Sequence, residues 1–328
     1  MKFVLASLMA VACMAQTWTP QISGSNASLR GINAVNSKVA FASGSGGTWL
    51  VTKDGGNTWQ ANKVPGAEQL DFRAVHAVDE QNVYLLSIGP GDKSRIYRTA
   101  DGGSHWDLLL TNPDAKGFLD ELVFWDPLHA IVLGDPVDGE FAILTTADGG
   151  KHWTRQHAPA ALSGEGAFAA SNSSIAVLGT SEVWFGTGGP GGARVFHSQD
   201  GGKTWRVSTT PIRNDAAAAG IFSLAFSNAL HGIAVGGDYS KPPEDSKNIA
   251  LTTDGGVTWT EPPARPKGFR SAIAWLPDRK AWLATGTSGS DISTDGAKSW
   301  TTFDTGNYNA FSLQWAVGPR GRIGRLTF

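Results

Sequence analysis

The chain has almost no cysteine and little charge. Its 328 residues include one cysteine, Cys13, and charged residues make up 17% of them, with a formal net charge of −2. A single cysteine cannot form an internal disulfide. The near-neutral charge gives no electrostatic basis for binding nucleic acid or an anionic membrane surface. Beyond the first residues, no apolar run is long enough for a membrane-spanning helix. We therefore expect a chain that is held together by its core, without a membrane span or a nucleic-acid partner.

The first fifteen residues have the layout of a secretory signal peptide. Lys2 precedes an apolar run from Phe3 to about Ala12, and small residues follow. Such a run is too short to cross a bilayer. We predict cleavage near Ala15 and a secreted or periplasmic mature chain, residues 16–328, that has no thiol. Lipid attachment at Cys13 is the alternative, although Ala10 occupies the position where that signal prefers leucine.

Glycine and tryptophan are abundant, with 41 and 13 residues, and both recur in a repeated motif. The stretch "TADGGKHW" (146–153) has close copies at 52–59, 99–106, 198–205 and 252–259, and a weaker copy, "STDGAKSW", at 293–300. The motif aspartates are Asp54, Asp101, Asp148, Asp200, Asp254 and Asp295, and the tryptophans are Trp59, Trp106, Trp153, Trp205, Trp259 and Trp300. Recurrence every 41 to 54 residues indicates a repeat architecture.

Each repeat contains four strand-length segments. In one unit these are "FRAVHAV" (72–78), "NVYLLSIG" (82–89), "SRIYRTA" (94–100) and "HWDLLL" (105–110), with turn residues between them. No segment has a sustained helical period. Four short strands in about 40–45 residues are typical of one blade of a β-propeller.

The two ends of the chain supply a seventh blade. Segments 309–317 and 321–328 resemble inner strands but have no outer strand after them, whereas 17–23, with Trp18, resembles an outer strand that has no blade. A sheet completed by both termini closes the ring and leaves no open edge. We predict one all-β domain, a seven-bladed β-propeller closed by its N-terminal strand.

The repeated motif is expected to be structural. It lies between the third and fourth strands of each unit, where the aspartate carboxylate can accept hydrogen bonds from the turn's own N–H groups. The glycines adopt positive φ without a steric penalty, and the tryptophan can pack between neighbouring blades. Six copies spread around a ring cannot converge on one substrate, so we do not expect the motif to be catalytic.

The pattern S/T-x-D-G-G-x-T-W resembles the Asp-box, or BNR repeat, of sialidases, sortilin-type receptors and the photosystem II stability/assembly factor propellers. The stretches "DFRAVHAV", "GDPVDGEF", "GEGAFAAS", "GIFSLAF" and "GGDY" are most similar to bacterial secreted relatives of the last group. This resemblance covers nearly the whole mature chain. It implies a propeller fold and a role in binding or assembly, and it is not specific for one function.

Strand direction sorts the remaining polar residues onto one face. The start of each innermost strand and the end of each second strand lie near the axis, on the side opposite the motif turns. Residues at these positions are Arg30, Arg73, Arg270, Asp120, Glu121, Glu165, Asp135, Asp238 and Tyr239. Arginines, carboxylates and a phenol are thus expected around one mouth of the central channel.

Three roles for this mouth remain open. The charges can pair across the channel and hold the blades in register. They can bind an anionic or polyhydroxylated ligand, protein or glycan, because guanidinium groups suit carboxylates. Alternatively, Asp135, Glu165, Asp238 and Tyr239 can supply a glycoside hydrolase site. The arginine motif of sialidases, F/Y-R-I-P, is matched only by "FRAV" at Arg73, which lacks the proline, so we favour a non-catalytic binding or assembly protein.

No motif for a cofactor or a metal is evident. "GTGGPG" (186–191) leads into a strand, so it lacks the helix N-terminus that holds a pyrophosphate. The seven histidines show neither HxxxH nor HExxH spacing. Calcium at the carboxylate-rich mouth stays open. We expect a monomer without a cofactor.

Overall fold

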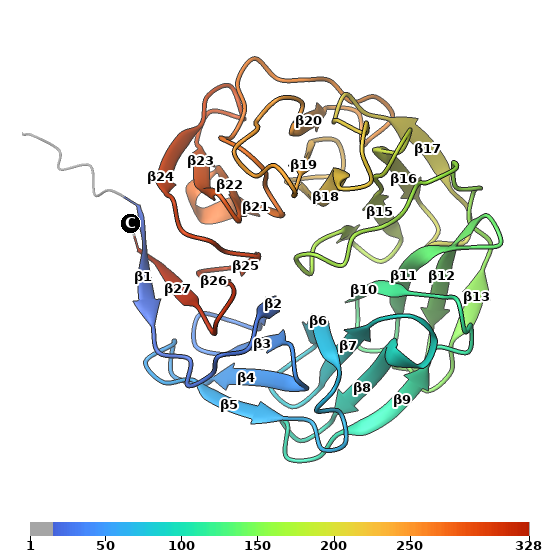
Figure 1. The fold of residues 1–328 in the computed structure, drawn as a ribbon, viewed down its shortest axis with the longest axis vertical. Helices are drawn as coiled ribbons and strands as arrows, with labels where there is room; N and C mark the ends of the chain where they lie inside the picture. The colour runs from blue at the N-terminus through green and yellow to red at the C-terminus, as the bar shows by residue number, and fades with distance from the viewer. Residues whose placement is uncertain (1–15, 328) are drawn as a thin grey trace, which may run out of the picture.

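Seven antiparallel sheets form a closed ring around a central axis (Figure 1). The computed structural model describes residues 16–327, so the predicted signal peptide, with Cys13, and Phe328 lie outside the described residues. Six of the sheets have four strands, and one has three. Within the described range, helical structure is limited to two short 3-10 turns, η1 (Gly91–Lys93) and η2 (Pro277–Arg279). The predicted seven-bladed propeller is confirmed.

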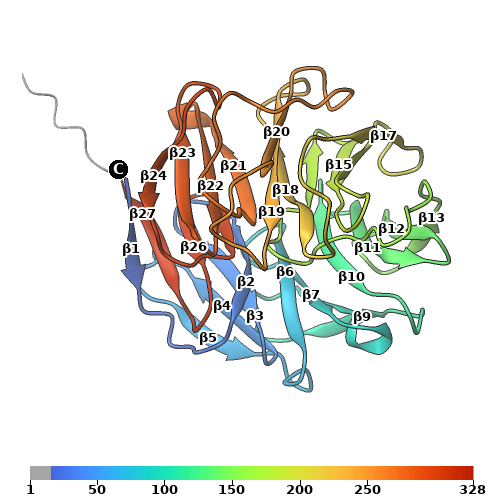
Figure 2. The ribbon, with the colours of Figure 1, turned by 45° about the horizontal axis from the view of Figure 1, so that its top comes forward.

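The blades follow one another in chain order, and within each blade the strands run outward from the axis (Figures 1 and 2). The first three blades are β2 (Leu29–Ala34), β3 (Ala40–Gly44), β4 (Thr48–Thr52), β5 (Gln60–Lys63); β6 (Asp71–Ala77), β7 (Val83–Ile88), β8 (Arg95–Thr99), β9 (Asp107–Thr111); and β10 (Leu119–Phe124), β11 (Ala130–Val137), β12 (Glu140–Thr146), β13 (Thr154–Gln156). Blades four to six are β14 (Ile175–Leu178), β15 (Glu182–Gly186), β16 (Arg194–Ser198), β17 (Arg206–Thr209); β18 (Ala219–Phe226), β19 (Gly232–Asp238), β20 (Ile249–Thr252); and β21 (Ala272–Leu276), β22 (Ala281–Gly286), β23 (Gly289–Ser293), β24 (Thr301–Asp304). The last blade is β25 (Ala310–Ser312), β26 (Trp315–Val317), β27 (Ile323–Thr327) and β1 (Thr17–Gln21).

The hydrophobic core lies between the blades. It consists of seven clusters, and each cluster joins the facing surfaces of two neighbouring sheets. The motif tryptophans belong to these clusters, as predicted. Trp106 of the second blade, for example, packs edge-on against Trp49 of the first, with ring centroids 5.4 Å apart. Burial of apolar area between sheets therefore holds the ring together.

The six repeated turns, called here the DGG turns, share one hydrogen-bond pattern. In the first, Asp54 Oδ1 accepts the N–H of Thr58 at 3.0 Å, Asp54 Oδ2 accepts the Thr58 hydroxyl at 2.6 Å, and Gly56 N donates to Thr52 Oγ1. Both glycines have positive φ, 76° and 84°. Both carboxylate oxygens therefore accept hydrogen bonds within the turn itself, which agrees with the structural role predicted for the motif.

Two blades depart from the regular pattern. The fifth sheet lacks a fourth strand, and only a bridge between Leu251 and Thr260 marks its place. The prolines that follow, Pro262 and Pro263, have no N–H to donate to a ladder. In the fourth blade, the sequence predicts an innermost strand that starts at "GEGAF", but β14 begins only at Ile175.

Residues 166–174, called here the channel segment, instead line the central channel and contact several blades. Asn172, with φ 61°, accepts the N–H of Val75 of the second blade, and Ser173 bonds the Ser223 hydroxyl of the fifth. Ser174 donates its N–H and hydroxyl to Glu121 of the third blade, each at 3.3 Å. In Figure 1 a loop before β15 reaches toward the axis. This segment ties the inner strands together across the channel.

The ring closes at the N-terminal strand, as predicted. β1 pairs antiparallel with β27 in a register that sets Trp18 opposite Leu326, and the two strands lie side by side in both views (Figures 1 and 2). The Trp18 ring is 4% exposed, packs against Phe303, Tyr308 and Phe311, and donates its N–H to Ser290 of the sixth blade. One side chain thus links the last two blades.

Replacing Trp18 with alanine should lower the free energy of unfolding by about 3–5 kcal/mol, because a buried indole leaves a large cavity at the closing sheet. Thr19→Val, an exposed position of the same strand, keeps the β-branched shape and should change it by less than about 0.5 kcal/mol. Urea unfolding of both variants measures the difference. Equal effects of the two substitutions would contradict closure by Trp18.

Glu121 should make stability depend on pH. Burial raises the pKa of its carboxyl to about 8, from 4.5. The folded state therefore holds a proton that the unfolded state releases, so this stabilisation is complete below pH 4.5 and is lost as pH rises toward 8. Between pH 5 and pH 9, wild type should lose about 4 kcal/mol relative to Glu121→Gln. Urea titrations at both pH values measure this. Exposed Glu80→Gln should follow wild type, and a parallel course of wild type and Glu121→Gln would overturn the prediction.

Candidate functional site at the channel mouth

One mouth of the channel contains a cavity of about 460 Å³. Five of the predicted site residues line it together: Arg30 on β2, Arg73 on β6, Asp120 on β10, Asp135 on β11, and Tyr239 directly after β19. They come from four blades and are up to 209 positions apart in the chain, from 30 to 239. Closure of the ring is what brings them to one place.

Two guanidinium groups form the basic side of this mouth cavity. Arg73 Nε donates to Asp71 Oδ2 at 2.9 Å, and Arg73 Nη1 donates to the carbonyl of Ala169 in the channel segment at 3.1 Å. Arg30 makes no side-chain hydrogen bond or ion pair within the described part of the chain. Burial, and then the charge of Arg73, lower the pKa of Arg30. An anion bound between the two arginines would offset both the desolvation of Arg30 and its repulsion from Arg73.

Two carboxyl groups form the acidic side. Asp120 is 2% exposed, and its Oδ2 has no hydrogen-bond partner. Asp135 Oδ1 accepts the N–H of Ala167 at 2.9 Å. Burial raises the pKa of both groups, and the charges of Asp135 and Glu121 raise that of Asp120 further. Both carboxyls are therefore costly to ionise without a neighbouring cation.

Aromatic rings form the rest of the wall, and sequence reasoning missed them. Phe168 stacks on Phe222 with centroids 3.9 Å apart, and Phe222 meets Phe269 edge-on at 4.7 Å. Phe118 also lines the mouth cavity. The signal was in the sequence, because each of these phenylalanines follows a glycine by one or two residues near the start of an innermost segment: "KGF" (116–118), "GAF" (166–168), "GIF" (220–222) and "KGF" (267–269).

Four of the nine predicted residues do not line the mouth cavity, and Arg270 and Glu121 are two of them. The expectation for Arg270 is wrong, because its side chain is fully buried within the sixth blade, where Nε donates to Asp291 Oδ2 at 2.8 Å and Nη1 to the carbonyl of Phe269. Glu121 alternates with Asp120 along β10 and points the other way, to Ser174. Both are held by internal contacts.

The four residues of the hydrolase alternative are not brought together either. Glu165 is buried and bound to Thr187 and Arg194, and Asp238 is buried and accepts both the N–H and the hydroxyl of Ser240. Only Asp135 and Tyr239 of that set line the mouth cavity. The expected placement of Glu165 failed because residues 166–174 do not form the expected inner strand.

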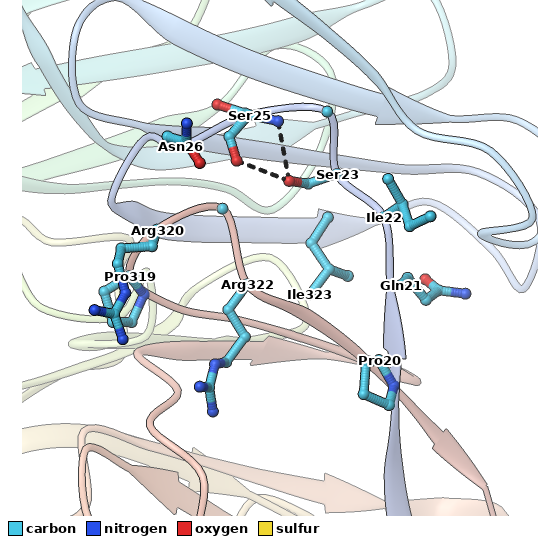
Figure 3. A pocket seen from close by; sticks show the side chains of 12 residues that line it. Pro20, Gln21, Ile22, Ser23, Ser25, Asn26, Pro319, Arg320, Arg322 and Ile323 are labelled. Carbon is cyan, nitrogen blue, oxygen red and sulfur yellow. Dashed lines mark hydrogen bonds between the residues drawn. The ribbon is translucent and has the colours of Figure 1, made fainter.

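A second cavity, of about 480 Å³, lies at the seam of the ring (Figure 3). It is bordered by residues 20–26, which include the end of β1, and by residues 319–323, which reach the start of β27. Arg320 and Arg322 extend to the same side of this turn in Figure 3, and the Arg322 guanidinium lies over the Tyr308 ring at 5.6 Å. No unpartnered buried polar atom lines it, so the mouth cavity is the stronger candidate site.

The described residues contain no group of three or more His, Cys, Asp or Glu side chains placed to hold a metal ion. No helix in the described range is both long and apolar enough to cross a membrane.

Comparison with known proteins locates the fold. No family model matches the chain, and no curated protein matches it. Among solved structures, YCF48 bound to D1 peptide has a TM-score of 0.67 at 16% identity, covering 95% of this chain and 97% of that one. YCF48 from Cyanidioschyzon merolae has a TM-score of 0.64 at 18% identity, with 94% and 98% covered. The WD40 propeller domain of Doa1 has a TM-score of 0.64 at 14% identity, with 96% and 97% covered.

Identities this low establish the fold and nothing finer. The matches nevertheless extend over nearly the full length of both chains, and two of the three are to YCF48, a photosystem II assembly factor. The resemblance predicted from the sequence is therefore confirmed: the chain is a seven-bladed propeller similar in fold to the photosystem II stability/assembly factor propellers.

Proposed function

We propose that this protein is a non-catalytic binding propeller that holds an anionic segment of a partner protein at the mouth of its channel. The observation that carries the proposal is the Arg30 guanidinium, which lines the mouth cavity next to Arg73 without an acidic partner of its own in the described chain. A partly buried guanidinium that has no hydrogen-bonded acidic partner is costly, and an incoming carboxylate removes part of that cost.

The space at the mouth suits a chain segment better than a single ion. The mouth cavity shares Phe118, Asp135, Ala167 and Phe168 with an adjoining cavity of about 640 Å³ that extends over the third and fourth blades. The aromatic walls supply the apolar contact that anchors peptide side chains at interfaces. A protein of the same fold, YCF48, has been solved with a peptide bound, which supports a protein partner over a glycan.

The proposal includes the location of this activity. The residues before Gln16 have the layout of a signal peptide, so we propose that the mature chain binds its partner outside the cytoplasm. Carboxylates at the mouth do not by themselves favour a hydrolase, because Glu165 and Asp238 are already bound to internal partners.

Crosslinking at the mouth tests the binding function. A photoreactive phenylalanine analogue in place of the half-exposed Tyr239 should capture a peptide segment of a partner in the native host, identified by mass spectrometry. Purified wild type should then bind a synthetic copy of that segment. Arg30→Ala and Arg73→Ala should each weaken binding about 10- to 100-fold, the value of a hydrogen bond between charged groups.

Arg206→Ala is the matched control, because Arg206 is exposed on the outer strand β17, far from the mouth. It should bind like wild type. Undiminished binding by both Arg30→Ala and Arg73→Ala would overturn the proposal, and capture of glycans without any protein segment would assign the mouth to a different class of ligand.

A further inference from the structure

The acidic side of the mouth cavity is not explained by an anionic ligand. Asp120 and Asp135 come from the adjacent strands β10 and β11, and both line the cavity that the two arginines line. An anion bound at Arg30 does nothing for two carboxyl groups on the other wall. The anionic ligand proposed above therefore does not explain why Asp120 and Asp135 line this cavity.

These carboxyls are not neutralised by the protein. None of the ion pairs within the described chain includes Asp120 or Asp135. The charge of Arg73 acts on Asp120, but the Nε of Arg73 is held by Asp71. Asp120 Oδ2 is enclosed and has no partner, whereas nearly all buried polar atoms in folded proteins have one.

The two carboxyls differ in access. Asp120 is 2% exposed, whereas Asp135 is only partly buried, with Oδ1 bound to the N–H of Ala167. Asp135 is therefore the more accessible of the two carboxyls to a group that enters the mouth cavity. A compact cation with several donors suits such a pair, because each carboxylate can accept one of its N–H bonds.

The surrounding rings fit the stem of such a cation. Phe168, Phe222 and Phe269 form a contiguous apolar wall in the same cavity, with centroid distances of 3.9 and 4.7 Å between neighbours. A methylene chain packs on aromatic rings while its charged head reaches a polar group. An ammonium group near ring faces gains cation–π attraction as well.

We infer that the mouth cavity also recognises a primary ammonium group, which binds between Asp120 and Asp135 while an anionic group of the same ligand meets Arg30. The inference rests on the proposed function and specifies its ligand as a segment that carries both charges within one cavity length. The ammonium comes either from a lysine side chain or from the N-terminus of the partner segment, and the test separates these two sources.

Four small probes with a free carboxylate make the test. Nα-acetyl-lysine carries a side-chain ammonium, and Nα,Nε-diacetyl-lysine lacks it. Trialanine carries a terminal ammonium, and N-acetyl-trialanine lacks it. Calorimetric titration of wild type at pH 7 should show at least one ammonium probe binding about tenfold more tightly than its acetylated counterpart, as expected for a charge-assisted pair in a desolvated site.

Asp120→Asn and Asp135→Asn should reduce that difference to less than about threefold, and should leave the acetylated probes unchanged because these lack the charge involved. Glu121→Gln is the matched control: it makes the same kind of carboxyl-to-amide change at the neighbouring buried position, which faces Ser174 and not the mouth cavity, and it should keep the wild-type difference. Circular dichroism verifies that each variant is folded.

The outcomes separate this inference from the proposed function. If acetylated and free probes bind equally, and Arg30→Ala weakens the binding of all of them, the anion-binding site at Arg30 is supported and the ammonium site is wrong. A difference that persists in both Asp120→Asn and Asp135→Asn also overturns the ammonium site. If no probe binds to wild type, the ammonium inference falls, and the crosslinking experiment alone decides the proposed function.

Discussion

Apolar packing between neighbouring blades is the interaction on which the rest of this structure depends. No single sheet has a core of its own, since each of the seven hydrophobic clusters takes side chains from two adjacent sheets. A ring is the arrangement that lets every sheet bury both faces. The strand that completes it, β1, comes from the other end of the chain, so the last cluster forms only when residues near both termini meet at Trp18 and Leu326.

The position of the mouth cavity is a consequence of that closure. The cavity is lined by residues that come from different blades and are far apart in the sequence, such as Arg30, Arg73, Asp120 and Tyr239. They meet because each lies at the end of its strand that faces this mouth of the channel. Residues of the channel segment also line this cavity, and the Ala169 carbonyl accepts a hydrogen bond from Arg73. The DGG turns serve the other side of the molecule, where each carboxylate is satisfied within its own turn. The face of the DGG turns therefore serves stability, and the binding site that we propose lies on the opposite face.

The repeated motif made the fold predictable from the sequence. Asp, two glycines and tryptophan at fixed spacing specify the turn, its positive φ angles and its interblade ring, and the unmatched Trp18 segment located the closing strand. The placement of single charges was harder. Arg270 and Arg73 occupy similar sequence contexts, "GFRS" and "DFRA", but Arg270 has Asp291 of its own blade as a buried partner, 21 residues further on. Such an ion pair depends on side-chain geometry, which the alternation of apolar and polar residues along a strand does not reveal.

The channel segment was the other limit of sequence reasoning. "GEGAFAASNSS" has the length of an inner strand, and only its contacts with three other blades reveal that it lies across the axis. Because of this difference, Glu165 forms an internal ion pair with Arg194, and Phe168 lines the mouth cavity.

A crystal structure of the protein with its captured partner segment tests the central claim most directly. The account predicts that an acidic group of the segment lies within hydrogen-bond distance of the Arg30 guanidinium, inside the mouth cavity and against the phenylalanine wall. A segment bound on the outer strands or on the face of the DGG turns, with Arg30 untouched, would contradict it.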